Sequence, residues 1–272
     1  MQKDALLACD MDGTVIPLET GEERDREIRE FHRLLAKHEN VVLAYVTGRH
    51  LELGLAGVVQ YSLPMPDIFV CDVGTTIYVR SHGVWGVDQQ YRHELLRSWQ
   101  GLTGADIGPL LETLSVLTAQ EEEKQQEFKQ SYYVSRDVNH GEVMRLIVDR
   151  LAGSGVRANV NYSVDGKKDI GLVDVLPEAA AKDSALVYLR KKLGLEKDRV
   201  VYGGDSGNDL QAFVSGFNAI VVNNTPEAVK KEVRRQAREK GIEERIYFAS
   251  AMYVQGVMEG CLHFNLLQPS GK

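Results

Sequence analysis

The chain alternates short apolar runs with longer amphipathic stretches through its first third. Three of the runs, at 5–9, 41–46 and 68–71, have the length and continuity of buried strands. Between the first two, apolar residues recur at helical spacing from 22 to 38, with charged residues on the remaining positions. The pattern therefore predicts a strand, an amphipathic surface helix, and then two further strands.

The last third repeats this alternation. Helices are predicted over 183–195, 208–214 and 226–240, and strands over 199–203 and 218–222. Strands that alternate with helices in this way are typical of a parallel sheet with helices on both faces. The fold class predicted is α/β, with a Rossmann-like parallel sheet as the core.

The middle of the chain has a different pattern. Residues 86–172 contain alternating stretches, among them Ser131-Tyr132-Tyr133-Val134-Ser135, and two helical stretches near 106–118 and 140–152. We expect a separate α+β domain inserted into the parallel one. The predicted division is 1–85 for the first part of the core, 86–172 for the insert and 173–272 for the second part of the core.

Composition narrows the function classes. A formal net charge of -7 argues against sequence-independent binding to nucleic acid. The apolar runs are too short to span a membrane, and no secretory signal is apparent, so we expect a cytoplasmic protein. Three cysteines without metal-type spacing indicate neither a disulfide framework nor a zinc site.

The first segment with candidate catalytic residues follows directly after the first predicted strand: Asp10-Met11-Asp12-Gly13-Thr14. One carboxylate of such a pair can attack an electrophile while the other transfers a proton, and both can attract a cation. A chance Asp-x-Asp-Gly turn is the alternative, because Asp and Gly are common in tight loops.

Three more polar segments stand near predicted strand ends. Thr47-Gly48-Arg49 follows the second strand, Gly204-Asp205-Ser206-Gly207-Asn208-Asp209 follows a late strand, and Lys182 precedes the helix leading to that late strand. Each alone could be an ordinary turn or a surface lysine. Together they favour one site, because ligands of parallel sheets bind beyond the carboxyl ends of the strands.

This set of side chains suits phosphoryl transfer. Asp10 is the predicted nucleophile, Asp12 the acid and base, and Lys182 the cation that offsets negative charge. Asp205 and Asp209 offer oxygen ligands to a hard cation, for which Mg²⁺ is the prediction. The residues predicted to bind phosphate are Thr47, Gly48, Arg49 and Asn208.

In their order along the chain, these four motifs resemble the haloacid dehalogenase (HAD) superfamily of phosphatases. The resemblance implies that Mg²⁺ is bound by Asp10, the backbone carbonyl of Asp12 and Asp205, with Asp209 supporting. The large insert is similar to the C2-type α/β cap of subclass IIB, which contains Cof-type sugar phosphatases, phosphomannomutases and sucrose-phosphate phosphatases.

Finer detail resembles the sucrose-phosphate phosphatases. The segments that carry this likeness are 73–78, 127–133, 174–177 and 256–264. Two departures exist: Asp183 stands where the family usually has Gly, and the stretch from Asp165 to Val173 is a few residues longer. Because the second departure falls in a sugar-binding segment, related disaccharide phosphates stay open as substrates.

The predicted function is Mg²⁺-dependent hydrolysis of a sugar phosphate, sucrose 6-phosphate or a related disaccharide phosphate, through an aspartyl-phosphate. The alternatives are a phosphohexomutase such as phosphomannomutase, and a non-catalytic sugar-binding protein. Cap residues predicted to contact the sugar are Lys129, Lys168 and Asp169. Apart from this small molecule, we expect neither nucleic acid nor membrane as a partner.

Overall fold

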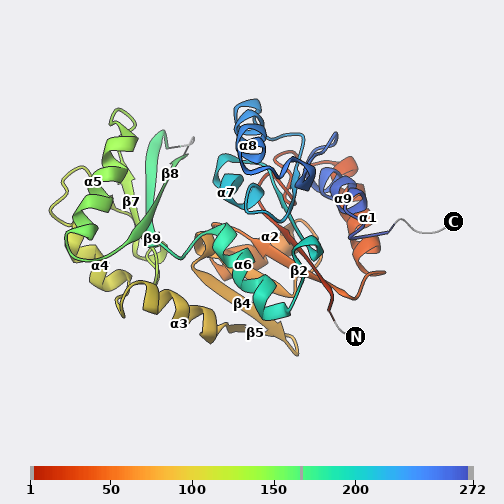
Figure 1. Ribbon diagram of the computed structural model, residues 1–272, viewed down its shortest axis with the longest axis horizontal. Helices are drawn as coiled ribbons and strands as arrows, with labels where there is room; N and C mark the ends of the chain where they lie inside the picture. The colour runs from red at the N-terminus through yellow and green to blue at the C-terminus, as the bar shows by residue number, and fades with distance from the viewer. Residues whose placement is uncertain (1–2, 166–167, 269–272) are drawn as a thin grey trace. The chain divides into compact units, whose positions relative to one another are not determined.

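The computed structural model describes residues 3–165 and 168–268. The chain forms two compact units, which are described separately: unit 1 comprises Met1–Gly86 with Lys182–Lys272, and unit 2 comprises Val87–Ala181. Figure 1 shows both units and the labels of their helices and strands.

Unit 1 contains an eight-stranded sheet in the order β12-β11-β10-β1-β2-β3-β4-β5. The strands are β1 (Ala5–Cys9), β2 (Val41–Val46), β3 (Ile68–Cys71), β4 (Thr76–Ser81), β5 (Val84–Val87), β10 (Val200–Gly204), β11 (Asn218–Val221) and β12 (Ile246–Phe248). Pairing is parallel from β12 to β3, whereas β3 and β4 pair antiparallel. The predicted α/β class is confirmed, with an antiparallel hairpin extending one side of the sheet.

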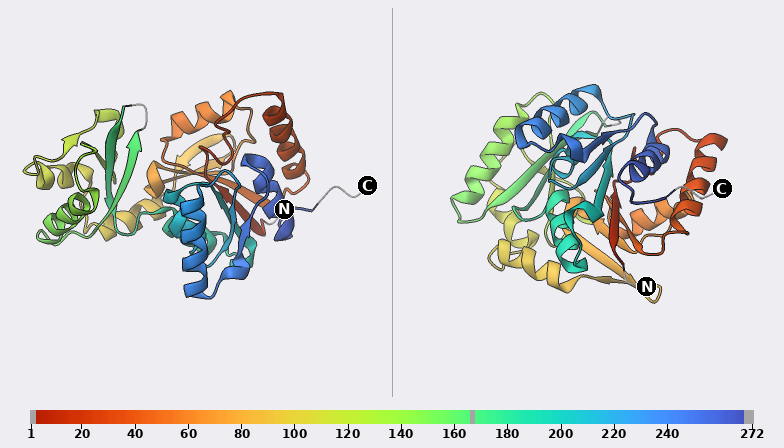
Figure 2. Two further views of the ribbon diagram at one scale, coloured as in Figure 1. Left: turned by 90° about the horizontal axis from the view of Figure 1, so that it is seen from above. Right: turned by 45° about the vertical axis from the view of Figure 1, so that its right-hand side comes forward.

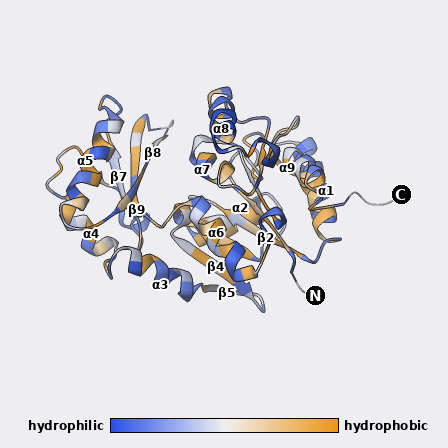
Figure 3. Cartoon of the chain, viewed as in Figure 1, coloured by the Kyte–Doolittle hydropathy of each residue, from blue (hydrophilic) through white to orange (hydrophobic). Residues whose placement is uncertain are grey.

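Helices cover both faces of this sheet, so its inner strands are apolar throughout. The helices are α1 (Glu22–Leu35), α2 (Leu51–Gln60), α6 (Lys182–Leu193), α7 (Leu210–Phe213), α8 (Glu227–Lys240) and α9 (Tyr253–His263). Side chains of α1, α2 and α9 pack with alternate residues of β1 in one buried cluster, and α6 and α8 lie on the other side (Figure 2). Figure 3 shows hydrophobic colour following the central strands.

Unit 2 has a four-stranded antiparallel sheet in the order β6-β7-β9-β8. Its strands are β6 (Thr118–Ala119), β7 (Gln130–Val134), β8 (Ala158–Asp165) and β9 (Ile170–Pro177), and its helices are α3 (Gln89–Ser98), α4 (Gly104–Leu111) and α5 (His140–Ala152). Tyr132, Val134, Val173 and Val175 are buried on one face of the sheet, where α4 and α5 lie (Figure 1). On the other face, the 3₁₀ helix Glu122–Lys124 reaches Ser131, whose Oγ donates to the carbonyl of Lys124 over 3.3 Å.

Unit 2 ends at Ala181, whereas the sequence analysis expected the insert to end at residue 172. β9 pairs with β8 as far as Pro177, which faces Ala158, so residues 173–181 stay with the second sheet. Helix α4 also differs from the predicted 106–118: it begins at Gly104 and ends at Leu111. Short 3₁₀ helices occupy Asp72–Gly74, Glu122–Lys124, Lys197–Arg199, Gly207–Asp209 and Glu243–Arg245.

Over the two described stretches, 3–165 and 168–268, no helix combines the length and the apolar composition needed to cross a membrane.

Candidate active site

The site forms where β1 and β10 end side by side. Cys9 faces Gly203 across the parallel pair, and the backbone N–H of Asp10 donates to the carbonyl of Gly203 over 2.9 Å. Asp10 and Asp205 are the first residues beyond their strands. Neighbouring parallel strands therefore bring two carboxylates together that are almost two hundred positions apart in the sequence.

A buried lysine links the nucleophile candidate to a second carboxylate. Lys182, the first residue of α6, donates from Nζ to Oδ1 of Asp10 over 2.9 Å and to Oδ1 of Asp209 over 2.6 Å. All three side chains are under a tenth exposed. Charged groups are buried only when they are paired. Each charge of this ion-pair triad is therefore stable in the interior only because the others are present.

The charges of the triad depend on one another. Burial raises the pKa of Asp10 to about 7, although the charge of Lys182 acts in the opposite direction. Burial also disfavours a charged Lys182, but the charges of Asp10 and Asp209 outweigh it and raise the pKa of the lysine above its ordinary value. For Asp209, Lys182 and hydrogen bonds outweigh burial, and its pKa is lowered. Lys182 is therefore the fixed cation of the site.

Asp205 has its own support from the loop after β1. Thr14 donates from Oγ1 to Oδ1 of Asp205 over 2.8 Å. Gly13, at φ +82°, lies so close that a Cβ added there would be 2.3 Å from Oδ2 of Asp205. Burial raises the pKa of Asp205 to about 6, with the Thr14 hydrogen bond opposing the shift. The glycine and threonine of the Asp-Gly-Thr segment thus shape the surroundings of a distant carboxylate.

Asp209 is the most enclosed acid of the group. Its Oδ1 accepts hydrogen bonds from Lys182 and from the hydroxyl of Tyr202, the latter over 2.5 Å. Its Oδ2 accepts from the backbone N–H groups of Asp205 and Ser206. Sequence reasoning missed Tyr202, because it lies inside an apolar strand and only the structure shows its hydroxyl beside Asp209.

The acid group fits a divalent metal by its donor chemistry. Asp10, Asp205 and Asp209 are buried, and one carboxylate oxygen from each lies within 4.8 Å of the other two. Oxygen ligands of this kind suit hard cations such as Mg²⁺. Three carboxylates facing one lysine also leave negative charge that a cation would offset.

The structure brings Asp12 to Arg49. The guanidinium donates from Nε to Oδ2 of Asp12 over 2.8 Å and from Nη2 to Oδ1 over 2.5 Å. This two-bond geometry is the strong form of the arginine–carboxylate pair. The predicted acid and base and a predicted phosphate ligand are thus partners of each other.

The remaining predicted phosphate ligands lie in two loops. Thr47 is buried, and its Oγ1 accepts from the backbone N–H of Arg49 over 3.1 Å. Gly48 stands between them. Asn208 belongs to the loop after β10, where its Oδ1 accepts from Nζ of Lys182 over 3.1 Å. Asn208 therefore joins the triad, and Thr47 fixes the backbone next to Arg49.

In unit 2 the three predicted sugar contacts differ in setting. Lys129 is buried, one residue before β7. Lys168 donates from Nζ to the Tyr133 hydroxyl over 3.2 Å and lies near Glu121. Asp169 accepts from Arg136 in an exposed ion pair. Lys168 and Asp169 are exposed and bonded to neighbouring side chains, and Lys129 is buried.

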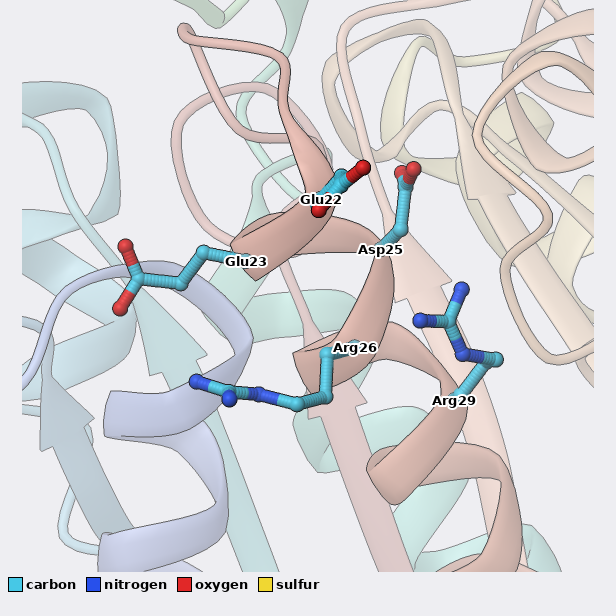
Figure 4. Close-up of a pocket in the computed structure, with 5 residues that line it drawn as sticks. All are labelled: Glu22, Glu23, Asp25, Arg26 and Arg29. Carbon is cyan, nitrogen blue, oxygen red and sulfur yellow. The ribbon is translucent and has the colours of Figure 1, made fainter.

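A hollow of about 720 Å³ lies against α1, lined by Glu22, Glu23, Asp25, Arg26 and Arg29 (Figure 4). Figure 4 shows the five side chains extending from one helix. Ligand sites combine apolar walls with polar groups from several elements. The residues that line this hollow are all charged, so the buried acids and lysine around Asp10 are the better candidate for an active site.

The fold is that of the phosphatases of the HAD superfamily. A sucrose-phosphatase from Synechocystis sp. PCC6803, solved in complex with sucrose and phosphate, has a TM-score of 0.77, is 25% identical and covers 99% of this chain and 100% of its own. The chain belongs to the sucrose-6F-phosphate phosphohydrolase family, which matches residues 3–265. The resemblance to sucrose-phosphate phosphatases is thereby confirmed.

Two further proteins are similar to this chain in sequence. A putative HAD-like hydrolase of Nitrosococcus oceani is 34% identical over 271 residues, covering 97% of this chain and 72% of that protein. The mannosylfructose-phosphate phosphatase of Agrobacterium fabrum is 28% identical over 263 residues, covering 96% of this chain and 97% of that protein. The relatives thus include phosphatases named for more than one disaccharide phosphate.

Proposed function

We propose that this protein hydrolyses the phosphate ester of a disaccharide phosphate, sucrose 6-phosphate or a close analogue, through an aspartyl-phosphate on Asp10. The observation that carries the proposal is the buried contact of Lys182 with both Asp10 and Asp209, beside Asp205. A buried group of this composition has no structural need for three acids, whereas phosphoryl transfer uses a nucleophile, a fixed cation and metal ligands.

In the first step, a carboxylate oxygen of Asp10 attacks phosphorus, and the bond between phosphorus and the sugar oxygen breaks. Asp12 gives its proton to that oxygen, so the sugar leaves as a neutral alcohol. Arg49 is bonded to Asp12 in two places, and a phosphate arriving at Arg49 would compete for the same guanidinium. We infer that substrate binding frees Asp12 for its proton.

In the second step, water attacks the phosphorus of the aspartyl-phosphate. Asp12 takes a proton from the water, the bond between phosphorus and Asp10 breaks, and orthophosphate forms. Lys182 stays charged throughout, because two acids hold its pKa above the ordinary value. It offsets the charge that accumulates between nucleophile and phosphate.

A divalent metal, Mg²⁺ in our proposal, would be bound by Asp10, Asp205 and Asp209 with the backbone carbonyl of Asp12. When bound, it would screen the repulsion between carboxylate and phosphate.

Sugar selectivity is proposed to lie in unit 2. On the sheet face opposite α4 and α5, Ser131, Asp174 and Asn161 face one another across β7, β9 and β8. Ser131 is buried and donates to Asp174 over 2.6 Å, so the half-buried Asp174 and Asn161 are the polar groups offered to a sugar. Tyr133 and Leu172 form the next row. Polar groups beside an aromatic and an apolar side chain suit a sugar ring and its hydroxyls. Lys129 precedes the same strand as Ser131 and supplies a cation.

A phosphate-release screen tests the proposal. Sucrose 6-phosphate, mannosylfructose phosphate, monosaccharide phosphates and p-nitrophenyl phosphate are each incubated with the protein and Mg²⁺. We expect release from a disaccharide phosphate and none from the Asp10→Asn variant. Formation of an isomeric sugar phosphate without orthophosphate would instead indicate a phosphohexomutase. Binding without turnover of any ester would indicate a sugar-binding protein.

The role of Lys129 is tested by Lys129→Met, which keeps the length of the side chain and removes its charge. We expect kcat/KM for the disaccharide phosphate to fall about tenfold, the loss of one charge-assisted hydrogen bond of about 1.4 kcal/mol. Hydrolysis of p-nitrophenyl phosphate is the control and should change little. An equal fall for both substrates would show that Lys129 acts through the fold rather than on the sugar.

A further inference from the structure

A left-handed turn follows β3 at the same edge of the sheet as Asp10. Three consecutive residues have positive φ: Asp72 at 52°, Val73 at 61° and Gly74 at 97°. Glycine adopts this conformation freely and Asp does so at modest cost, but a β-branched residue is a genuine outlier there. Strained residues of this kind persist where the surroundings require them, and they cluster at functional sites.

The turn is bonded to the backbone of the proposed phosphate loop, Thr47-Gly48-Arg49. The N–H of Asp72 donates to the carbonyl of Arg49 over 3.0 Å, and the N–H of Val73 donates to the carbonyl of Thr47 over 3.1 Å. The N–H of Thr47 donates to Val70 over 2.8 Å. Both ends of the loop are therefore bonded to β3 and its turn.

The side chain of Val73 also reaches the loop. Its Cγ2 lies 3.8 Å from the point that a Cβ of Gly48 would occupy, which is van der Waals distance. The branched side chain thus packs over the one loop residue that has none. A glycine at position 73 would adopt the same φ without strain, but it would leave Gly48 uncovered.

We propose that Val73 is a positioning residue for phosphate binding. Its backbone N–H, bonded to Thr47, and its side chain, packed beside Gly48, hold Thr47-Gly48-Arg49 in one conformation. Through the guanidinium of Arg49 they also fix Asp12. This inference rests on the proposed function, because Thr47 and Arg49 are phosphate ligands only in that proposal. It concerns a residue outside the four motifs, and it predicts an effect on phosphate affinity rather than on metal binding.

The test compares Val73→Gly and Val73→Ala with the wild type. His82→Gly is the matched control: His82 also has a positive φ, of 50°, but it follows β4, whose antiparallel pairing with β3 carries it toward the opposite edge of the sheet. For each protein we measure the melting temperature, its increase with Mg²⁺, kcat and KM for p-nitrophenyl phosphate, and the inhibition constant of orthophosphate.

We expect both Val73 variants to weaken orthophosphate inhibition and to raise KM by about fivefold or more, with a smaller change in kcat. Val73→Gly should keep or raise the melting temperature, because strain is relieved, and the Mg²⁺ response should be unchanged. His82→Gly should leave all kinetic constants unchanged. Weakened phosphate affinity in a protein of undiminished stability cannot come from partial unfolding.

Two results would overturn the inference, and they differ from each other. An active wild type whose Val73 variants bind orthophosphate within twofold of it would overturn the inference alone. A wild type that neither releases phosphate nor is inhibited by it would overturn the proposed function and this inference together. Should Val73→Gly fail to fold, Val73→Ala decides on the same criteria, since it keeps a Cβ at the strained position.

Discussion

The glycine of the Asp-x-Asp-Gly segment should be irreplaceable for two separable reasons. In Gly13→Ala, the positive φ of +82° would cost an L-residue about 1 kcal/mol. The new Cβ would also be 2.3 Å from Oδ2 of Asp205, so the carboxylate must move by about 1 Å to restore ordinary contact. That movement breaks the 2.8 Å hydrogen bond from Thr14, worth about 2 kcal/mol for a charged acceptor.

Two control substitutions separate these contributions. Gly216→Ala has a similar φ of +87° and nothing within 4 Å of the new Cβ, so it measures the backbone cost alone. Gly204→Ala has no positive φ, but its Cβ would be 2.7 Å from the carboxyl carbon of Asp209, so it measures displacement of an acid. We expect losses of about 3 kcal/mol for Gly13→Ala and about 1 kcal/mol for Gly216→Ala.

The assay is urea unfolding of the metal-free proteins, followed by the shift of melting temperature on adding Mg²⁺. Gly216→Ala should retain the Mg²⁺ response of the wild type, whereas Gly13→Ala and Gly204→Ala should lose most of it because an acid has moved. Equal stability losses for Gly13→Ala and Gly216→Ala, with the same Mg²⁺ response, would refute the reasoning that Gly13 is needed to make room for Asp205.

Three further predictions concern the charged groups. Asp12→Asn should slow sugar esters at least about tenfold more than aryl phosphates, whose leaving groups need little protonation; equal slowing, measured by phosphate release, would contradict the acid role. Burial raises the pKa of Asp10 to about 7 and of Asp205 to about 6, so the folded state binds these protons more tightly than the unfolded state. The metal-free protein should therefore lose stability as pH rises from about 4 to about 7. Mg²⁺ should raise the melting temperature more at a pH of about 8 than at a pH of about 5, because the acids are then unprotonated. An equal increase at both pH values would count against metal binding by these acids. Lys182→Met should lower the free energy of unfolding by about 3 kcal/mol, because a buried acid pair loses its cation, and an unchanged urea midpoint would be evidence against the triad.

The strands that the sequence predicted best are the short, continuous apolar runs. The apolar runs 5–9, 41–46 and 68–71 became β1, β2 and β3 with unchanged bounds, because a buried parallel strand has apolar residues on both faces. Helix α9 was not predicted, since Gly256 and Gly260 weaken a helical pattern. The structure gives the reason for each: a Cβ on Gly260 would be 2.3 Å from Ile220 of β11, and a Cβ on Gly256 would be 2.4 Å from the carbonyl oxygen of Ala251.

Some residues of the candidate site could be predicted from the sequence, and some of their contacts could not. Asp10, Asp205, Asp209 and Lys182 could be grouped from the sequence, because each stands near a strand end and parallel strands share an edge. The pairing of Asp12 with Arg49 depends on the conformation of the long Arg49 side chain, which the local sequence does not indicate. The left-handed backbone of Val73 is equally hidden, since valine itself argues against such a conformation.

The position of β1 has a consequence for the growing polypeptide. This strand is flanked by β2, which is synthesised soon after it, and by β10, which begins only at Val200. While the intervening residues emerge, the β10 side of β1 is an unpaired, wholly apolar edge, the kind of surface that promotes aggregation. A nascent chain interrupted before Val200 would carry Asp10 but leave that edge unpaired. The C-terminal third thus covers the first strand of the sheet, and it also supplies the acids that lie beside Asp10.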